Sequence, residues 1–87
     1  MHEMSLIADL LHKIADEVRR AGAQRARRVQ VKLGALAHIS ADHFREHFEQ
    51  GIRDSVAEGA VLDIEISSDL NDPHAQEIRL ISLEVED

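Results

Sequence analysis

The chain has 87 residues, a formal net charge of −7, two aromatic residues and no cysteine. This length allows one small domain with a thin core, and the missing cysteines exclude disulfides, thiolate metal ligands and a cysteine nucleophile. The negative charge and the few aromatic rings argue against nucleic acid as a partner. No segment approaches the roughly 20 apolar residues of a membrane span, and no signal peptide is recognisable, so we expect a cytoplasmic protein without a membrane partner.

The first predicted element is an amphipathic helix over residues 4–21. Its apolar side chains recur every four positions and so share one helix face, as shown by Leu6, Leu10, Ile14 and Val18. Gly22 is a suitable end, because glycine readily adopts the left-handed backbone that terminates many helices. Residues 28–33 then alternate between polar and apolar side chains, which predicts a strand with one face in solvent.

A second helix is predicted from Ser40 to about Val56. Ser40 is a good N-cap, and Ile39 and Phe44 stand at the two positions of a hydrophobic staple. A second strand follows at residues 61–66, with Leu62, Ile64 and Ile66 expected to face the core. The Ser, Asp, Asn and Pro content of "SSDLNDPHAQ" (67–76) predicts a loop.

The third predicted strand, residues 78–85, has a fault in its alternation. Ile78 and Leu80 share one phase, whereas Ile81, Leu83 and Val85 share the other. A β-bulge near residues 81–82 would shift the register between the two sets. A central strand that is apolar on both faces would show the same pattern, and the sequence does not decide between these alternatives.

The order α-β-α-β-β predicts an α+β fold. Two amphipathic helices can cover one face of a three-stranded sheet, which gives a two-layer sandwich. Because only about ten residues join the second and third strands, we expect these two strands to be antiparallel neighbours. Residues 1–87 are expected to form a single domain.

The sequence shows no sign of an enzyme. It contains neither a glycine-rich phosphate loop nor a G-x-S-x-G nucleophile motif, and a sandwich of this size has little depth for a pocket. The segment "RRAGAQRARR" (19–28) holds five arginines and no acid. These cations suit the negative end of a helix dipole followed by a solvated strand edge, or alternatively a docking patch for an acidic protein surface.

Three groups at the amino terminus could bind a metal ion. The amine of Met1, the amide nitrogen of His2 and the His2 imidazole can close adjoining chelate rings on one ion. Loss of the amide proton and square-planar nitrogen ligation point to Ni(II) or Cu(II), and such binding should weaken in acid. A histidine at position 2 can also arise by chance, so spacing alone leaves the metal role open.

Histidines elsewhere in the chain are weaker candidates. His43 and His47 are four positions apart on the second helix and could hold one ion together. They flank Phe44 and Phe48, however, and a partly exposed helix face explains the pattern equally simply.

Four segments resemble the HypA family of nickel metallochaperones, which serve the maturation of nickel-iron hydrogenase and, in some members, urease. They are "MHEMSL", "RVQVKLGALAHIS", "EGAVLDIEI" and "EIRLISLEVED". The resemblance implies that nickel is carried by the amino-terminal histidine with nearby main-chain nitrogens, hence by Met1, His2 and Glu3 here. It also implies a nickel GTPase of the HypB type as partner, with the hydrogenase large subunit or the urease machinery as recipient.

One departure from the family pattern is large. The family usually inserts a zinc domain with two C-x-x-C pairs between the second and third strands, where this chain has only the loop 67–76 and no cysteine. Zinc is therefore not expected, and His74 in the shortened loop becomes a candidate fourth nitrogen ligand for nickel. The alternative function is a metal-independent interaction or scaffold module of the same maturation machinery.

Overall fold

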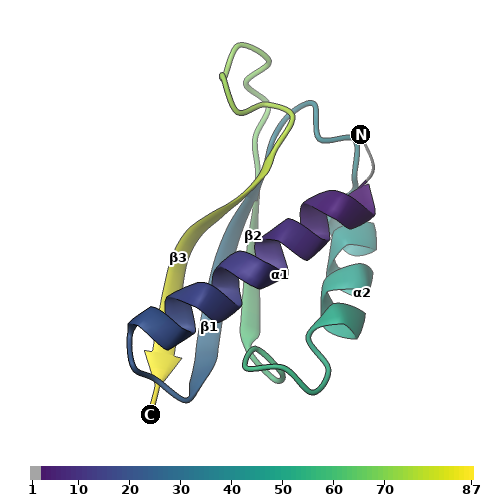
Figure 1. The fold of residues 1–87 in the computed structure, drawn as a ribbon. Helices are drawn as coiled ribbons and strands as arrows, with labels where there is room; N and C mark the ends of the chain where they lie inside the picture. The colour runs from purple at the N-terminus through teal and green to yellow at the C-terminus, as the bar shows by residue number, and fades with distance from the viewer. Residues whose placement is uncertain (1–2) are drawn as a thin grey trace.

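The computed structural model describes residues 3–87, with side chains from residue 5 onward. Its elements are α1 (Glu3–Arg20), β1 (Arg25–Leu33), α2 (Ala41–Gly51), β2 (Val61–Ile66) and β3 (Ile78–Glu86). Both helices pack against one face of a three-stranded sheet (Figure 1), which confirms the predicted α+β sandwich. Within the described residues, no helix is both long and apolar enough to cross a membrane.

The strand order corrects one prediction. β2 and β3 are not neighbours, because the order is β2-β1-β3. β1 pairs with β2 in parallel, from Arg28 opposite Val61 to Leu33 opposite Ile66, and with β3 antiparallel. The loop after β2 crosses the end of β1, where the backbone N–H of Gly34 donates to the carbonyl of Glu77 at 3.0 Å. The eleven residues of this connection (67–77) therefore span one intervening strand. Loop length alone did not distinguish this arrangement from a hairpin.

The fault in β3 is a bulge. Gln30 of β1 lies opposite Ser82 and Val31 lies opposite Leu80, so Ile81 has no counterpart in the ladder. Ile81 is 43% exposed. β3 is an edge strand, which removes the alternative of a central strand buried on both faces. The extra residue lets Ile78 and Leu80 before it and Leu83 and Val85 after it all pack against the core.

The core lies between β1 and the two helices. Phe44 and Phe48 of α2 are fully buried, with ring centroids 5.7 Å apart, and they pack with buried residues of α1 and β1. Ser40 caps α2 as predicted, because its Oγ accepts from the backbone N–H of His43 at 3.1 Å. α2 ends at Gly51, earlier than the predicted Val56, and the left-handed backbone of Asp54 (φ 62°) stops the helix from continuing.

The opposite sheet face is polar. Arg28 donates to Asp63 of β2 at 2.7 Å and lies 3.7 Å from Glu84 of β3. The hydrogen bond and the charge of Asp63 raise the pKa of Arg28, which therefore stays charged. Gln30 accepts from Ser82 at 2.9 Å on the same face. These cross-strand pairs mark the face as a solvated one, although exposed ion pairs add little stability each.

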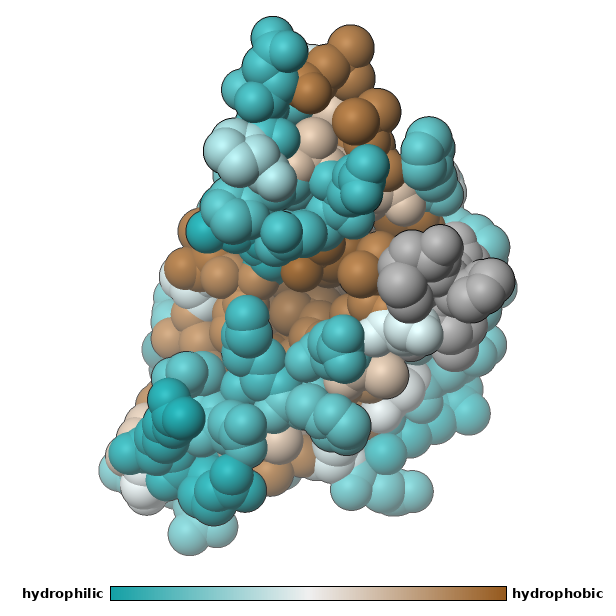
Figure 2. All heavy atoms as spheres, turned by 45° about the horizontal axis from the view of Figure 1, so that its top comes forward, coloured by the Kyte–Doolittle hydropathy of each residue, from teal (hydrophilic) through white to brown (hydrophobic). Residues whose placement is uncertain are grey.

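A few large apolar side chains remain at the surface. They are Val61, Ile66, Leu70 and Ile81. Ile66 is 65% exposed, so the prediction that it faces the core is wrong. Ile66 is the last residue of an edge strand, which has a neighbour on one side only. On β2, Leu62 is buried in the core and Ile64 is partly buried against it. Figure 2, which brings the loop end of the molecule forward, shows brown apolar side chains among teal polar ones.

Gly34 is expected to be intolerant of a side chain. A Cβ at this position would lie 2.1 Å from the carbonyl oxygen of Ala75, a backbone atom of the loop 67–76 that cannot easily move. We expect Gly34→Ala to lower the free energy of unfolding by about 1–3 kcal/mol, the usual effect of overpacking, in urea denaturation. Gly51→Ala is the matched control, since its Cβ meets only the flexible end of Leu11 and alanine favours helix. Equal losses in both variants would contradict the assigned packing.

Candidate metal centre

The predicted amino-terminal ligands are largely beyond what the structure describes. Met1 and His2 lie outside the described residues, and Glu3 is described only as the first residue of α1. The first turns of α1 pack beside α2, where Ile7, Ala8 and Leu11 line a small apolar groove together with His47, Gln50 and Gly51. The first turns of α1 therefore lie close to His47 of α2.

His74 sits in a loop that is held by its own side chains. Its backbone N–H donates to Asp72 Oδ1 at 2.8 Å, and its Nδ1 lies 3.0 Å from Glu77 Oε2. When Nδ1 carries the proton and donates to Glu77, Nε2 is left as the nitrogen that a metal ion could use. Among the described side chains, His74 is not part of a group of three potential ligands. The prediction that it binds nickel therefore stays a prediction.

Asp72 organises this loop electrostatically. The hydrogen bond from the backbone N–H of His74 is the main cause that lowers the pKa of Asp72, against the opposing effect of its partial burial. The positive charges of Lys32, His74 and Arg79 add to the lowering, with Lys32 Nζ 4.0 Å from Asp72 Oδ2. The carboxylate form of Asp72 therefore helps to hold the loop against the end of β1.

The charge on Asp72 should make the free energy of unfolding fall as the pH is lowered. Because its pKa is lowered by folding, the carboxylate stabilises the fold above the unfolded pKa of about 3.9, and this contribution is lost as pH falls through the folded pKa. We expect Asp72→Asn to lower the free energy of unfolding at pH 7, with the difference from the unaltered chain shrinking below about pH 4. Urea unfolding at a series of pH values measures this. A difference that stays constant down to pH 2 would contradict it.

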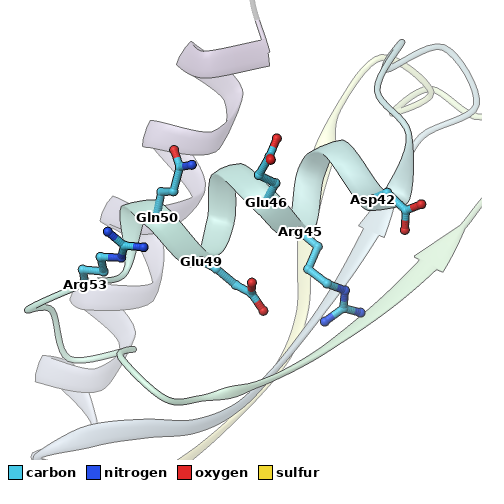
Figure 3. A pocket seen from close by; sticks show the side chains of 6 residues that line it. All are labelled: Asp42, Arg45, Glu46, Glu49, Gln50 and Arg53. Carbon is cyan, nitrogen blue, oxygen red and sulfur yellow. The ribbon is translucent and has the colours of Figure 1, made fainter.

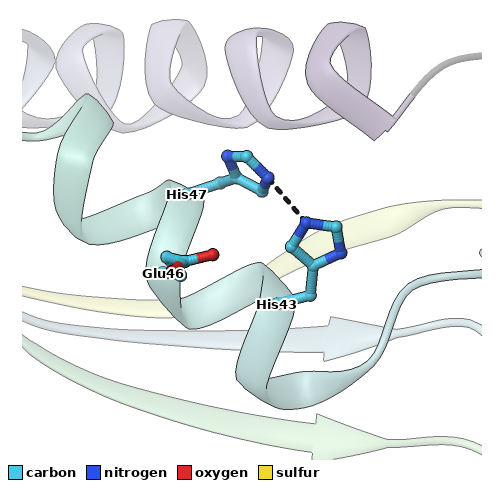
Figure 4. A group of neighbouring side chains, drawn as sticks. All are labelled: His43, Glu46 and His47. Atoms are coloured by element: carbon cyan, nitrogen blue, oxygen red, sulfur yellow. Dashed lines mark hydrogen bonds between the residues drawn. The ribbon is translucent and has the colours of Figure 1, made fainter.

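The described residues contain one cluster of side chains suited to a metal ion. His43, Glu46 and His47 of α2 present ligand atoms that all lie within 4.8 Å of one another. The two Nε2 atoms are 2.8 Å apart, and the ring centroids are 4.5 Å apart. Figure 4 shows both rings and the Glu46 carboxylate on the same stretch of helix. The sequence pointed to the histidine pair as a partly exposed helix face, and His47 is indeed half-buried and His43 exposed.

Sequence reasoning missed Glu46. Its position, three residues after His43 and one before His47, gives "HFREH" (43–47). Residues three and four apart are neighbours on a helix surface, and H-x-x-E-H is the spacing of a zinc-binding motif in which the two histidines hold the metal and the glutamate lies beside it. The signal was therefore present in the sequence and would have been found by testing acids at the third position as well as histidines at the fourth.

A second hollow on α2 does not resemble a binding site. It is lined by side chains of this one helix and the turn after it: Asp42, Arg45, Glu46, Glu49, Gln50 and Arg53. Figure 3 shows these side chains spread around the helix instead of converging on one point. Three carboxylates and two guanidinium groups in mixed order are typical of a solvated helix face.

The basic segment 19–28 is occupied by internal ion pairs. Arg19 pairs with Asp16, and Arg20 lies 3.8 Å from Glu17. The strand arginines also have acidic neighbours, since Arg27 lies 3.1 Å from Glu84 and Arg28 pairs across the sheet with Asp63. This arrangement favours the helix end and solvated strand over a docking patch.

The family comparison identifies the chain. Residues 1–85 match the model described as "HypA: Hydrogenase/urease nickel incorporation, metallochaperone, hypA". The chain belongs to the HypA family. The resemblance drawn from the MHEMSL start and the strand segments is thereby confirmed, and the family is one of metallochaperones, not of enzymes.

Individual relatives agree with this assignment. "Hydrogenase maturation factor HypA" of Methylocella silvestris is 41% identical over 66 residues, which cover 76% of this chain and 58% of that protein. The protein of the same description from Azoarcus sp. (strain BH72) is 40% identical over 65 residues, covering 75% and 57% respectively. The chain thus matches less than two thirds of the length of these HypA relatives.

Solved structures show the same fold. The solution structure of the Ni metallochaperone HypA from Helicobacter pylori superposes with a TM-score of 0.81 at 23% identity, covering 99% of this chain and 98% of that chain. A second solution structure of a HypA protein gives a TM-score of 0.73, also at 23% identity. This HypA chain has no cysteine, so it lacks the thiolates of the family's zinc domain.

Proposed function

We propose that this chain is a nickel-binding accessory protein for the maturation of nickel-iron hydrogenase. It holds Ni(II) at the amino terminus through Met1, His2 and Glu3 and delivers it together with a GTPase of the HypB type. The recipient is the hydrogenase large subunit or the urease machinery. The observation that carries this proposal is the match of residues 1–85 to a family described as nickel metallochaperones.

The chemistry of the first residues supports nickel as the cargo. A free amine, a main-chain amide nitrogen and an imidazole offer neighbouring nitrogen donors, which suit an ion with a square-planar preference. The amide must lose its proton, so binding releases protons and protonation favours release of the ion. A site of this kind needs no deep cavity, which fits a chain whose described pockets are shallow.

Residues 1–87 act, on this proposal, as a single domain in the cytosol. The loop 67–76 stands where the family's zinc domain is inserted, and His74 is a candidate additional ligand for nickel. Its Nε2 can be left available by the contact between Nδ1 and Glu77. Thiolate zinc binding has no part in this function, because the chain has no cysteine.

Nickel binding at the amino terminus should depend on both the amine and the His2 ring. We expect the calorimetric titration with Ni(II) to lose its tightest binding event in His2→Ala and in a chain extended by two residues before Met1, because each change removes nitrogen donors. His12→Ala is the matched control, since His12 is an exposed histidine of α1 and should leave the titration unchanged. Equal affinity in all four chains would rule the terminal site out.

The alternative is a metal-independent scaffold of the same machinery. The missing zinc thiolates favour it, because any coupling between zinc and nickel sites is lost with them. On this alternative, capture of the HypB-type GTPase by the immobilised chain would be the same for the native chain and His2→Ala, and no nickel binding would be measurable. We expect instead that nickel binding is measurable and that nickel loading alters the capture of the GTPase by the native chain only.

A further inference from the structure

The histidine pair of α2 is built more like a metal site than a chance surface pair. His43 and His47 stand four residues apart, which places them on one side of the helix. Their Nε2 atoms, the outermost ring nitrogens, are 2.8 Å apart and form the dashed contact in Figure 4. A metal ion bound between these two nitrogens would replace the hydrogen bond after a rotation of the rings, without a change of backbone.

The spacing of the nitrogens is short enough for both to bind one ion. Two metal–nitrogen bonds of about 2.05 Å place the nitrogens about 2.9 Å apart at a right angle and about 3.3 Å apart at a tetrahedral angle. The 2.8 Å of the present hydrogen bond is close to both separations. Imidazole suits Ni(II), Cu(II) and Zn(II) alike, and nickel is the ion that the description of the family names.

Glu46 supplies a third donor and a negative charge. One of its carboxylate oxygens lies within 4.8 Å of the ligand atoms of both histidines, near enough to reach a shared ion by a change of rotamer. Figure 4 shows the carboxylate beside the two rings. A negative ligand compensates the ion's charge and leaves the remaining coordination positions to water.

We propose that His43, Glu46 and His47 form a second metal site that binds one Ni(II) ion independently of the amino terminus. The ion is held by the two Nε2 atoms and one Glu46 oxygen. Each ring then carries its remaining proton on Nδ1, so one of the two hydrogen-bonded rings changes tautomer. No net proton is released when both rings are neutral, in contrast to the amino-terminal site, which must release the amide proton.

The site also has a defined place on the molecule. His47 lines the groove between the helices with Ile7, Ala8 and Leu11 of α1, while His43 and Glu46 are exposed. Phe44 and Phe48, which follow His43 and His47 directly in the sequence, are fully buried and fix the helix in place. The ligands are therefore carried by a helix that is anchored in the core.

The test isolates this site in a chain extended by two residues before Met1, in which the terminal amine is displaced. At pH 8, where ordinary imidazoles are neutral, Ni(II) titration of the extended chain should show one site. His43→Gln and His47→Gln should each weaken it at least tenfold, and Glu46→Gln by a smaller factor. The matched control is His12→Gln, which changes an exposed histidine on α1 and should leave the binding unchanged. Circular dichroism melting confirms that each variant folds.

Two further readouts separate this site from the terminal one. Titration in buffers of different ionisation enthalpy measures the protons released on binding. The extended chain should release almost none. The native chain that carries both His43→Gln and His47→Gln should release protons, because its amino-terminal site must lose the amide proton. The native chain should bind two ions, and His2→Ala should retain the α2 ion. The proposal is overturned if the extended chain binds no nickel or if the histidine variants leave its binding unchanged. It is also overturned if the native chain binds only one ion and that ion is lost both in His2→Ala and in the double variant.

Discussion

The position of β1 at the centre of the sheet determines where every other element lies. Its inward side chains Val29, Val31 and Leu33 are almost completely buried, and its backbone is paired on both sides. A parallel neighbour on one side requires a crossover, which α2 supplies by passing over the helical face. An antiparallel neighbour on the other side requires the chain to cross the end of β1, and the loop 67–76 does this. The helix with the histidines and the loop with His74 thus have their places because β1 is in the middle.

The two faces of the sheet differ in polarity. The inner face receives the phenylalanines of α2 and the apolar stripe of α1, and the outer face is a ladder of cross-strand ion pairs centred on Arg28. Because most arginines of the basic segment are engaged in such pairs, their charge is balanced locally by acids of β2, β3 and α1. The overall negative charge of the chain is consequently left on other surfaces.

The spacing of the apolar residues predicted the helices and strands well, because each face of this sandwich is either clearly buried or clearly exposed to solvent. The repeat of apolar residues placed α1, and Ser40 marked the start of α2 correctly, since both depend on neighbouring residues alone. The strand order could not be predicted, because a connection of eleven residues between β2 and β3 can form a hairpin or cross one strand. The exposure of Ile66 followed from its edge position, which is a tertiary property. For the site, the sequence pointed to His43 and His47 and also holds Glu46 at a spacing that brings it near them, but the approach of the three ligand atoms to within 4.8 Å depends on side-chain rotamers.

The two proposed nickel sites differ in how far they depend on the fold of the protein. A terminal chelate depends on ionisation of a main-chain amide and needs little from the fold, so acid or a competing donor can release its ion. A site on α2 depends on a rigid helix, since the two rings share an ion only while four intervening peptide units stay helical. The core under Phe44 and Phe48 ensures that rigidity. On α2, His43 and Glu46 are exposed, so an incoming ligand can exchange with those of the protein, and that accessibility suits delivery of an ion better than its permanent retention.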